Sequence, residues 1–287
     1  RGLGDVYKRQ LIDSTQALEL NTLPSSAVII GAGAVALEFA SLWNAAGCEV
    51  TLLIRKDRVL STWERRASMT LTRELKRRGV NVIARTAVDR VDTGANLGAT
   101  VHYRQGDSDE DRTAYGEVVL AAIGRVPNTD ADWFRSSGLK LDERGYVTVD
   151  GYGRTNLDGV WALGDITPGH ALAHRAFEQG ITIAEKIAGA DPKPVLDDTV
   201  PQVVFSFPEA ASVGLTLDQA KAREDVVEPK ETAYPMLSNA RMLMSGEGGS
   251  MTVVSGAFAN NPDMQVVLGV HIVSPIASDL IAEAEQL

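Results

Sequence analysis

The chain has 287 residues, a net charge of −10 and an apolar fraction of 44%. This length allows two domains with full cores, and the negative charge argues against a nucleic-acid partner, which needs a clustered basic surface. No apolar run is long enough to cross a bilayer, and a single cysteine, Cys48, excludes an internal disulfide and favours a cytoplasmic location.

Both ends of the sequence suggest an interrupted chain. Residues 1–10 (RGLGDVYKRQ) have no helical or strand period and are interpreted as a non-native addition, followed by a connector over 11–23. The last residues, IAEAEQL, stop inside a helical pattern without a cap or stop signal. We therefore expect a fragment of a longer protein.

Residues 24–130 alternate strand and helix patterns. Apolar runs predict strands at AVIIG, EVTLLI and VNVIA, and helical spacing follows the first two of them at 34–46 and ERRASMTLTRELKRRG. This alternation predicts a parallel sheet covered on both faces, and so an α/β fold. A two-residue period in ATVHYRQ and EVVLAAIG predicts antiparallel strands around a polar turn at 105–112.

The second half of the chain has a different organisation. Residues 131–195 contain the apolar runs YVTVD and GVWALGD and a helical pattern from Ala171 to Gly189, and the polar segment DPKPVLDDTVP is interpreted as a linker. Beyond it, PQVVFSF, SMTVVSGAF and QVVLGVHIV predict strands, with helical patterns at 216–223 and 276–287. Locally paired strands with helices on one side indicate an α+β module.

The stretch VIIGAGAVALEFA, residues 28–40, has the spacing of a dinucleotide-binding turn between a strand and a helix. Gly31 permits the tight turn, Gly33 lets the backbone approach a pyrophosphate, and Ala36 keeps helix and sheet close. The alternative is a glycine-containing packing turn without a ligand. The strand before the turn and the helix and second strand after it favour the dinucleotide site.

The end of that second strand bears on which dinucleotide binds. An acidic residue there would bind the ribose of NAD, but the chain has Ile54, followed by Arg55 and Lys56. Two cations suit the 2′-phosphate of NADP, so the sequence favours NADP. A solvated basic strand end is the alternative.

Five motifs in order resemble those of the pyridine nucleotide-disulfide oxidoreductases. They are STQALELNTLPSSAVIIGAGAVALEFA, AAIGRVPNT, TNLDGVWALGD, LAHRAFEQG and FSFPEAASVGLT. The segments NARMLMSGEGGS and VVLGVHIVSPIASDLIAEAEQL are most similar to the dihydrolipoyl dehydrogenase branch.

The resemblance implies a Rossmann-like FAD/NAD(P)-binding two-domain fold, present in part and followed by an α+β dimerisation domain. Residues 24–130 would bind NAD(P), 131–195 would be the C-terminal half of an FAD-binding domain, and 196–287 would form a homodimer through 201–287. The implied activity transfers a hydride between NAD(P)H and FAD and exchanges electrons with a disulfide such as lipoamide. A lipoyl-bearing protein would then be a partner.

The resemblance also implies roles for single residues. Glu38 would face the nicotinamide pocket, and Gly124 would lie at the strand end against the nucleotide. Asp165 would bind the ribityl and phosphate part of FAD, with Ala173 and His174 at the helix start beside the flavin ring. The structural alternatives are an exposed helix glutamate at 38, a turn-capping aspartate at 165 and a structural histidine at 174.

In this family a cysteine pair and a C-terminal His-Glu pair carry out the reaction, and the sequence contains neither pair. We expect Cys48 to pack as a small apolar residue, no catalytic residue in the chain, no metal site, and no activity of the chain alone. Two alternatives are an NAD(P)H-quinone reductase of the same fold and a non-catalytic nucleotide-binding and dimerisation fragment.

Overall fold

A computed structural model describes residues 10–94 and 98–286. Residues 1–9, which belong to the stretch interpreted as non-native, lie outside the described residues. The chain divides into two compact units: a larger one, which extends to Gly124 and resumes at Val203, and a smaller one, Arg125–Gln202.

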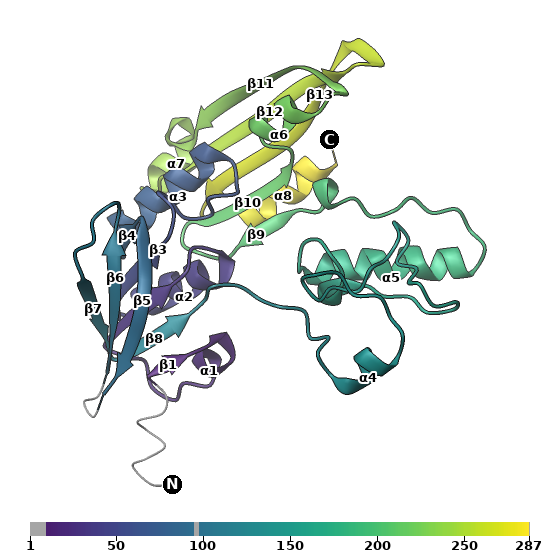
Figure 1. Cartoon of the computed structure of the whole chain (residues 1–287). Helices are drawn as coiled ribbons and strands as arrows, with labels where there is room; N and C mark the ends of the chain where they lie inside the picture. Colours follow the sequence, from purple (N-terminus) through teal and green to yellow (C-terminus); the bar gives the residue numbers. More distant parts are fainter. Residues whose placement is uncertain (1–9, 95–97, 287) are drawn as a thin grey trace. The chain divides into compact units, whose positions relative to one another are not determined.

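A parallel sheet forms the first half of the larger unit (Figure 1). Its strands lie in the order β1 (Leu11–Ile12), β8 (Val118–Ala121), β2 (Ser26–Ile30), β3 (Glu49–Ile54) and β4 (Asn81–Ala84), and all neighbours are parallel. The antiparallel prediction for EVVLAAIG was wrong, because β8 pairs in parallel with β2, Val119 opposite Val28. The reason is burial: Val118, Val119 and Leu120 are all buried, as in a strand covered on both faces.

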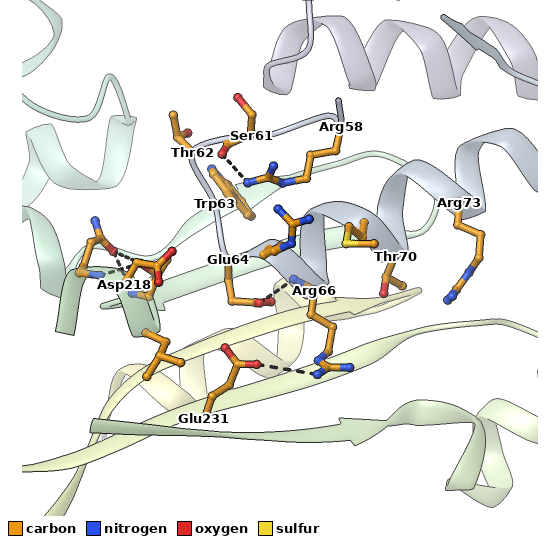
Figure 2. Close-up of a pocket in the computed structure, with 15 residues that line it drawn as sticks. Arg58, Ser61, Thr62, Trp63, Glu64, Arg66, Thr70, Arg73, Asp218 and Glu231 are labelled. Carbon is orange, nitrogen blue, oxygen red and sulfur yellow. Dashed lines mark hydrogen bonds and ion pairs between the residues drawn. The ribbon is translucent and has the colours of Figure 1, made fainter. Parts of the chain in front are cut away.

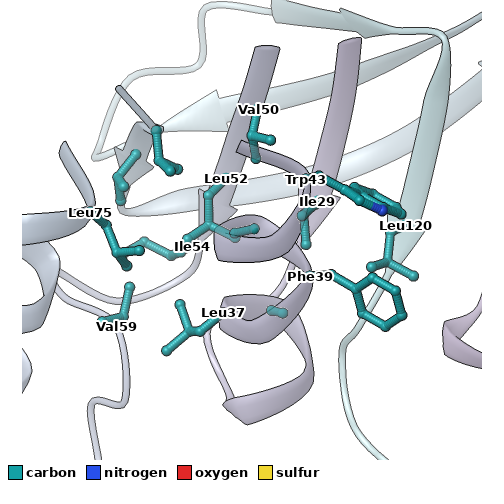
Figure 3. Close-up of a cluster of buried hydrophobic side chains, with 14 of the residues drawn as sticks. Ile29, Leu37, Phe39, Trp43, Val50, Leu52, Ile54, Val59, Leu75 and Leu120 are labelled. Atoms are coloured by element: carbon teal, nitrogen blue, oxygen red, sulfur yellow. The ribbon is translucent and has the colours of Figure 1, made fainter. Parts of the chain in front are cut away.

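The two faces of this sheet are covered by different structures. Helices α2 (Ala34–Ala45) and α3 (Arg65–Arg77) bury Leu37, Trp43 and Leu75 against Ile29 and Leu52, as Figure 3 shows. The opposite face packs on an antiparallel sheet of three strands, β5 (Thr86–Thr93), β6 (Ala99–Gln105) and β7 (Arg112–Gly116). The antiparallel prediction for ATVHYRQ is therefore confirmed.

The second sheet of the larger unit contains β9 (Gln202–Val204), β10 (Glu209–Gly214), β11 (Val226–Pro235), β12 (Ser250–Phe258) and β13 (Asn261–Ser274), in the order β11-β12-β13-β10-β9. One face is covered by α8 (Ala277–Glu285), whose Ala277 and Ile281 pack on Ile272. On another side α3 approaches β12, where the Ser250 hydroxyl donates to Thr70 Oγ1 at 3.3 Å. Two short helices complete this part, α6 (Leu217–Ala222) and α7 (Ala240–Ser245).

The smaller unit contains α4 (Asp132–Ser136), a 3-10 turn at Gly164–Ile166 and α5 (Ala173–Ile187). Its small core joins Phe134, Val147 and Ala162. The runs YVTVD and GVWALGD make only isolated bridges, Leu141 to Val147 and Arg154 to Trp161. The remaining short helix, α1 (Ser14–Leu18), belongs to the larger unit, and no described helix in either unit is long and apolar enough to span a membrane.

Candidate functional site

The turn between β2 and α2 requires a glycine at position 31. Gly31 has φ +144°, a conformation that side-chain-bearing residues rarely adopt, and a Cβ there would collide with the carbonyl oxygen of Ala122. Its N–H donates to Leu53 O at 3.1 Å, so the turn is joined to β3. Ala36 is fully buried beneath the turn, in the packing position that the sequence predicts.

Gly33 differs, because the backbone does not require a glycine there. It has φ −91°, and a Cβ added to it would meet no atom within 4 Å. It is also the N-cap residue of α2, and no side chain caps that helix. Free N–H groups at a helix N-terminus beside open space fit a pyrophosphate.

The loop after β3 lies against the glycine turn. The N–H of Leu60 donates to Ala32 O at 2.9 Å, and Ile54 is fully buried at the strand end. Arg55 and Lys56 are exposed, and among residues 10–94 and 98–286 neither side chain has a hydrogen-bond or ion-pair partner. The nearby carboxylate of Asp57 pairs instead with Arg58, at 2.9 Å. The charge of Arg55 and Lys56 is therefore available to an anion.

Gly124 follows the parallel strand β8, at the same edge of the sheet as the glycine turn. The carbonyl of Ala122, two residues before Gly124, is the group with which a Cβ at position 31 would collide. Gly124 has φ +142° and no atom within 4 Å of a built Cβ. The larger unit therefore brings Gly31, Gly33, Arg55 and Gly124 to the carboxyl edge of the sheet, where ligands bind in open α/β folds.

Glu38 lies one turn into α2 and is half-buried. Its Oε1 accepts a hydrogen bond from the N–H of Phe205 at 3.0 Å, and Ser41 Oγ accepts one from the N–H of Phe207 at 3.1 Å. Glu38 is therefore not an ordinary exposed helix glutamate. Sequence reasoning missed Ser41; its spacing of three residues from Glu38, which places both on one helix face, was the available signal.

Asp165 lies in the 3-10 turn of the smaller unit and is exposed. It does not cap that turn, because the N-cap position belongs to Leu163, and in the described part of the chain its carboxylate has no partner. Gly164 has φ +72°, and its N–H donates to Gln179 Oε1 of α5 at 2.9 Å. An unpartnered carboxylate beside a closely approached backbone fits the binding of sugar hydroxyls.

The start of α5 holds the other predicted flavin residues. Ala173 is the first helical residue and is exposed, and His174 lies with Nε2 2.7 Å from Pro201 O. Sequence reasoning missed Arg175, which is buried and donates to Asp197 Oδ1 at 2.6 Å and to Pro168 O at 2.7 Å. Arg175 therefore fixes the start of α5 relative to two surrounding loops.

Two other titratable residues are structural. Cys48 is buried, and burial, with the charges of Glu117 and Glu49, raises the pKa of its thiol to about 11. His271 lies inside the second sheet, 2.7 Å from Ser212 Oγ and 3.2 Å from Leu215 O, and burial lowers its pKa. The described residues contain no cluster of three potential metal ligands.

Comparisons with known proteins identify relatives over almost the whole chain. The sequence model for pyridine nucleotide-disulphide oxidoreductases matches residues 2–180, and the model for their dimerisation domain matches residues 200–287. Dihydrolipoyl dehydrogenase from Cupriavidus necator is 36% identical over 95% of this chain and 56% of its own length. The Geobacillus stearothermophilus enzyme of the same name is 36% identical over 96% of this chain and 57% of its own length.

Solved structures are also similar to this chain over almost its whole length. LpdA from Mycobacterium tuberculosis superposes with a TM-score of 0.83 at 29% identity and covers 100% of this chain and 60% of its own. The HOCl-induced flavoprotein disulfide reductase RclA from Escherichia coli has a TM-score of 0.83 at 24% identity, covering 96% of this chain and 61% of its own, which shows a shared fold. The chain spans between 56% and 61% of the length of these four relatives.

Proposed function

The chain belongs to the pyridine nucleotide-disulphide oxidoreductase family, and from this membership we propose that it is the nucleotide-binding and dimerisation part of a flavoprotein oxidoreductase. The whole protein would transfer a hydride between NAD(P)H and FAD and exchange electrons with a disulfide of the lipoamide type. Similarity to two dihydrolipoyl dehydrogenases supports this reaction and a lipoyl-bearing protein as partner.

One observation carries the nucleotide-binding part of this proposal: the open position at Gly33, at the uncapped start of α2. N–H groups of the first turn of α2 would donate to the pyrophosphate, and the missing side chain at Gly33 would let it approach the backbone. Glu38 would face the nicotinamide end. Arg55 and Lys56, both free of protein partners among the described residues, would bind a 2′-phosphate, which favours NADP.

The smaller unit would contribute to flavin binding. FAD, when bound, would accept the hydride and pass electrons on in pairs. Asp165 would accept hydrogen bonds from ribityl hydroxyls, and Ala173 and His174 would lie beside the flavin ring. The exposed, unpartnered carboxylate of Asp165 in the described chain supports this assignment.

The single cysteine of the sequence would take no part in disulfide exchange. Cys48 is buried and its raised pKa keeps the thiol protonated near neutral pH, whereas the thiolate is the reactive form. We therefore expect the 287-residue chain alone to lack NAD(P)H-lipoamide activity. The presence of a single cysteine in the sequence also supports a cytoplasmic location.

The proposed domain boundaries follow from the family. Residues 24–130 would be the NAD(P)-binding domain, 131–195 the C-terminal half of an FAD-binding domain, and 196–287 the dimerisation domain, with a homodimer formed through 201–287. The match of a dimerisation-domain model to residues 200–287 supports the last of these.

The test is calorimetric titration of the chain and its Gly33→Val variant with NADH and NADPH. Because a Cβ at position 33 meets no protein atom within 4 Å, the variant should keep the parent's melting temperature while losing nucleotide binding. Gly151→Val, at a glycine in the smaller unit that is also outside the left-handed region, is the matched control and should bind normally. Equal affinity of Gly33→Val and the parent would place the nucleotide elsewhere.

A further inference from the structure

A strongly basic stretch lies between residues 55 and 78 of a chain whose net charge is −10. It contains nine arginines and lysines and only three acidic residues. The proposed dinucleotide site uses only Arg55 and Lys56. Five of the other cations lie around α3 and line two adjoining hollows: Arg58, Arg65, Arg66, Arg73 and Lys76.

The two hollows have volumes of about 810 and 290 Å³ and share Arg58, Arg65, Met69 and Arg73 in their walls. These volumes are similar to those of small-molecule sites, about 300–1,000 Å³. Neither the glycine turn nor Arg55 nor Lys56 lines them. The hollows are therefore separate from the dinucleotide site, and we call them together the α3 groove.

The cations of the α3 groove lie on the solvent side of the helix. Arg65, Met69, Arg73 and Lys76 follow the helical period and are exposed, whereas Leu75 is buried in the core behind them. Within the described parts of the chain, Arg65 and Lys76 have no ion-pair or hydrogen-bond partner, and Arg73 reaches only Glu74, at 3.7 Å. Cations stacked along one helix face repel one another unless an anion neutralises them.

The α3 side of the groove has fewer acids than cations: Asp57 and Glu64 line it, and Asp57 pairs with Arg58. Glu64 caps α3, accepting hydrogen bonds from the N–H groups of Arg66 at 2.6 Å and Ala67 at 2.7 Å. Glu74 pairs with Arg77 at 2.7 Å and lines neither hollow. The α3 side of the groove therefore carries excess positive charge.

Arg58 is the fixed element of the wall that the hollows share. Its guanidinium donates to Ser61 O at 3.0 Å, as Figure 2 shows. It also donates to Asp57 at 2.9 Å, and its side chain is only 17% exposed. Its Nε is buried and has no acceptor among the described residues. The two bonds to Asp57 and Ser61 hold the guanidinium in one orientation in the shared wall of the hollows.

The opposite wall of the larger hollow is acidic. Asp218 lies in the first turn of α6 and Glu231 lies on β11, where Arg66 reaches toward it at 3.9 Å, as Figure 2 shows. A ligand that fills this hollow would meet guanidinium groups on the α3 side and carboxylates on the other. Such a ligand carries anionic groups at one end and hydroxyl or amino donors at the other.

We propose that the α3 groove binds a small phosphate-bearing polyanion. Arginine matches phosphate with paired, charge-assisted hydrogen bonds, and four guanidinium groups and one ammonium line the two hollows. The acidic wall favours a phosphate ester of a polyhydroxylated molecule over an inorganic polyphosphate. This proposal does not depend on the assignment of the dinucleotide site.

The experiment uses the 287-residue chain with Gly33→Val, so that the glycine turn is blocked, titrated by calorimetry at low salt. The probes are fructose 1,6-bisphosphate and inorganic pyrophosphate. The variant Arg65→Gln/Arg73→Gln, at two exposed positions, should weaken binding about tenfold or more, because each lost contact to a charged group is worth a factor of about ten. Lys76→Gln removes the ammonium group that lines the smaller hollow and should independently weaken binding of the probes.

Arg135→Gln/Arg241→Gln removes the same charge at exposed positions outside the groove and should bind both probes as the parent does. Tighter binding of the bisphosphate would assign the groove to phosphate esters, and tighter binding of pyrophosphate to inorganic polyphosphates. Equal weakening by the control pair would overturn the proposal, because attraction would then come from net charge alone. Binding of a glutamate-rich peptide without binding of either phosphate probe would overturn it in favour of a protein-docking surface.

Discussion

Glu38 Oε1 and the N–H of Phe205 form a hydrogen bond of 3.0 Å, although 167 residues separate them in the sequence. Phe205 belongs to the connection between β9 and β10, so the bond joins the helix of the glycine turn to the second sheet. Ser41 repeats the arrangement one turn later with Phe207, at 3.1 Å. The glutamate proposed to face the nicotinamide therefore also holds together two halves of the larger unit.

Replacing Glu38 by alanine should lower the free energy of unfolding by about 1 kcal/mol, because the bond is a charge-assisted one at a partly exposed site. Glu38→Gln keeps an acceptor oxygen and should cost less. Urea unfolding followed by circular dichroism measures both variants. Glu178→Ala, at an exposed position of α5, is the control; a loss in Glu38→Ala no larger than in this control would show that the Phe205 bond contributes nothing measurable.

Gly31→Ala should destabilise the fold by about 3 kcal/mol or more, because the new side chain meets both an unfavourable φ and the Ala122 carbonyl. Gly33→Ala, with open space around it, should leave the thermal midpoint unchanged. Thermal unfolding of the two alanine variants side by side checks the pair. Similar midpoints for both would contradict the conformational distinction between the two glycines.

Removing Arg55 should shift the cofactor preference toward NAD. A guanidinium contact to a 2′-phosphate is worth about 1.5–3 kcal/mol, so Arg55→Ala should reduce the ratio of NADPH to NADH affinity about ten- to a hundredfold. The ratio comes from parallel titrations of parent and variant. If the parent binds NADH at least as well as NADPH, or if the ratio does not change in Arg55→Ala, the NADP assignment is wrong. Arg90→Ala, on β5, controls for the loss of one positive charge.

Stability should fall at alkaline pH in a way that depends on Cys48. The thiol pKa is about 11 in the folded chain, against 9.0 for an exposed thiol, so folding favours the protonated form. Its contribution is complete below about pH 9.0 and is lost as the pH rises toward 11. Urea unfolding from pH 8 to pH 11 or so measures the loss, and Cys48→Ala should remove this part of it. The same slope in Cys48→Ala would assign it to other groups.

Local patterns were sufficient to predict much of the larger unit. The runs ATVHYRQ and SMTVVSGAF coincide with β6 and β12, because along most of each strand buried residues alternate with partly buried ones. The antiparallel prediction for EVVLAAIG was wrong for a physical reason. A short apolar run indicates that a strand is buried, but it does not indicate which strand it pairs with or in which direction. Its partners, β1 and β2, are set by tertiary packing.

The same limit applies to the candidate site. Spacing predicts the turn around Gly31 and the helix after it, since these depend on neighbours in sequence. It does not predict that Arg175 pairs with Asp197 or that Glu38 reaches Phe205, because those contacts close long loops. Sequence assigns the tight turn to Gly31 and the approach of the pyrophosphate to Gly33, and the surroundings of each Cβ position fit that difference.

That difference has a consequence for how the chain accumulates mutations. A substitution at Gly31 is eliminated because the molecule cannot adopt its turn, whether or not any ligand is needed. A substitution at Gly33 leaves a foldable molecule and is eliminated only where the pyrophosphate has to bind. In descendants that had abandoned the cofactor, position 33 would drift to other residues while position 31 stayed glycine. The residue at position 33 thus reports whether the cofactor is still bound, whereas the glycine at position 31 reports only that the turn is still formed.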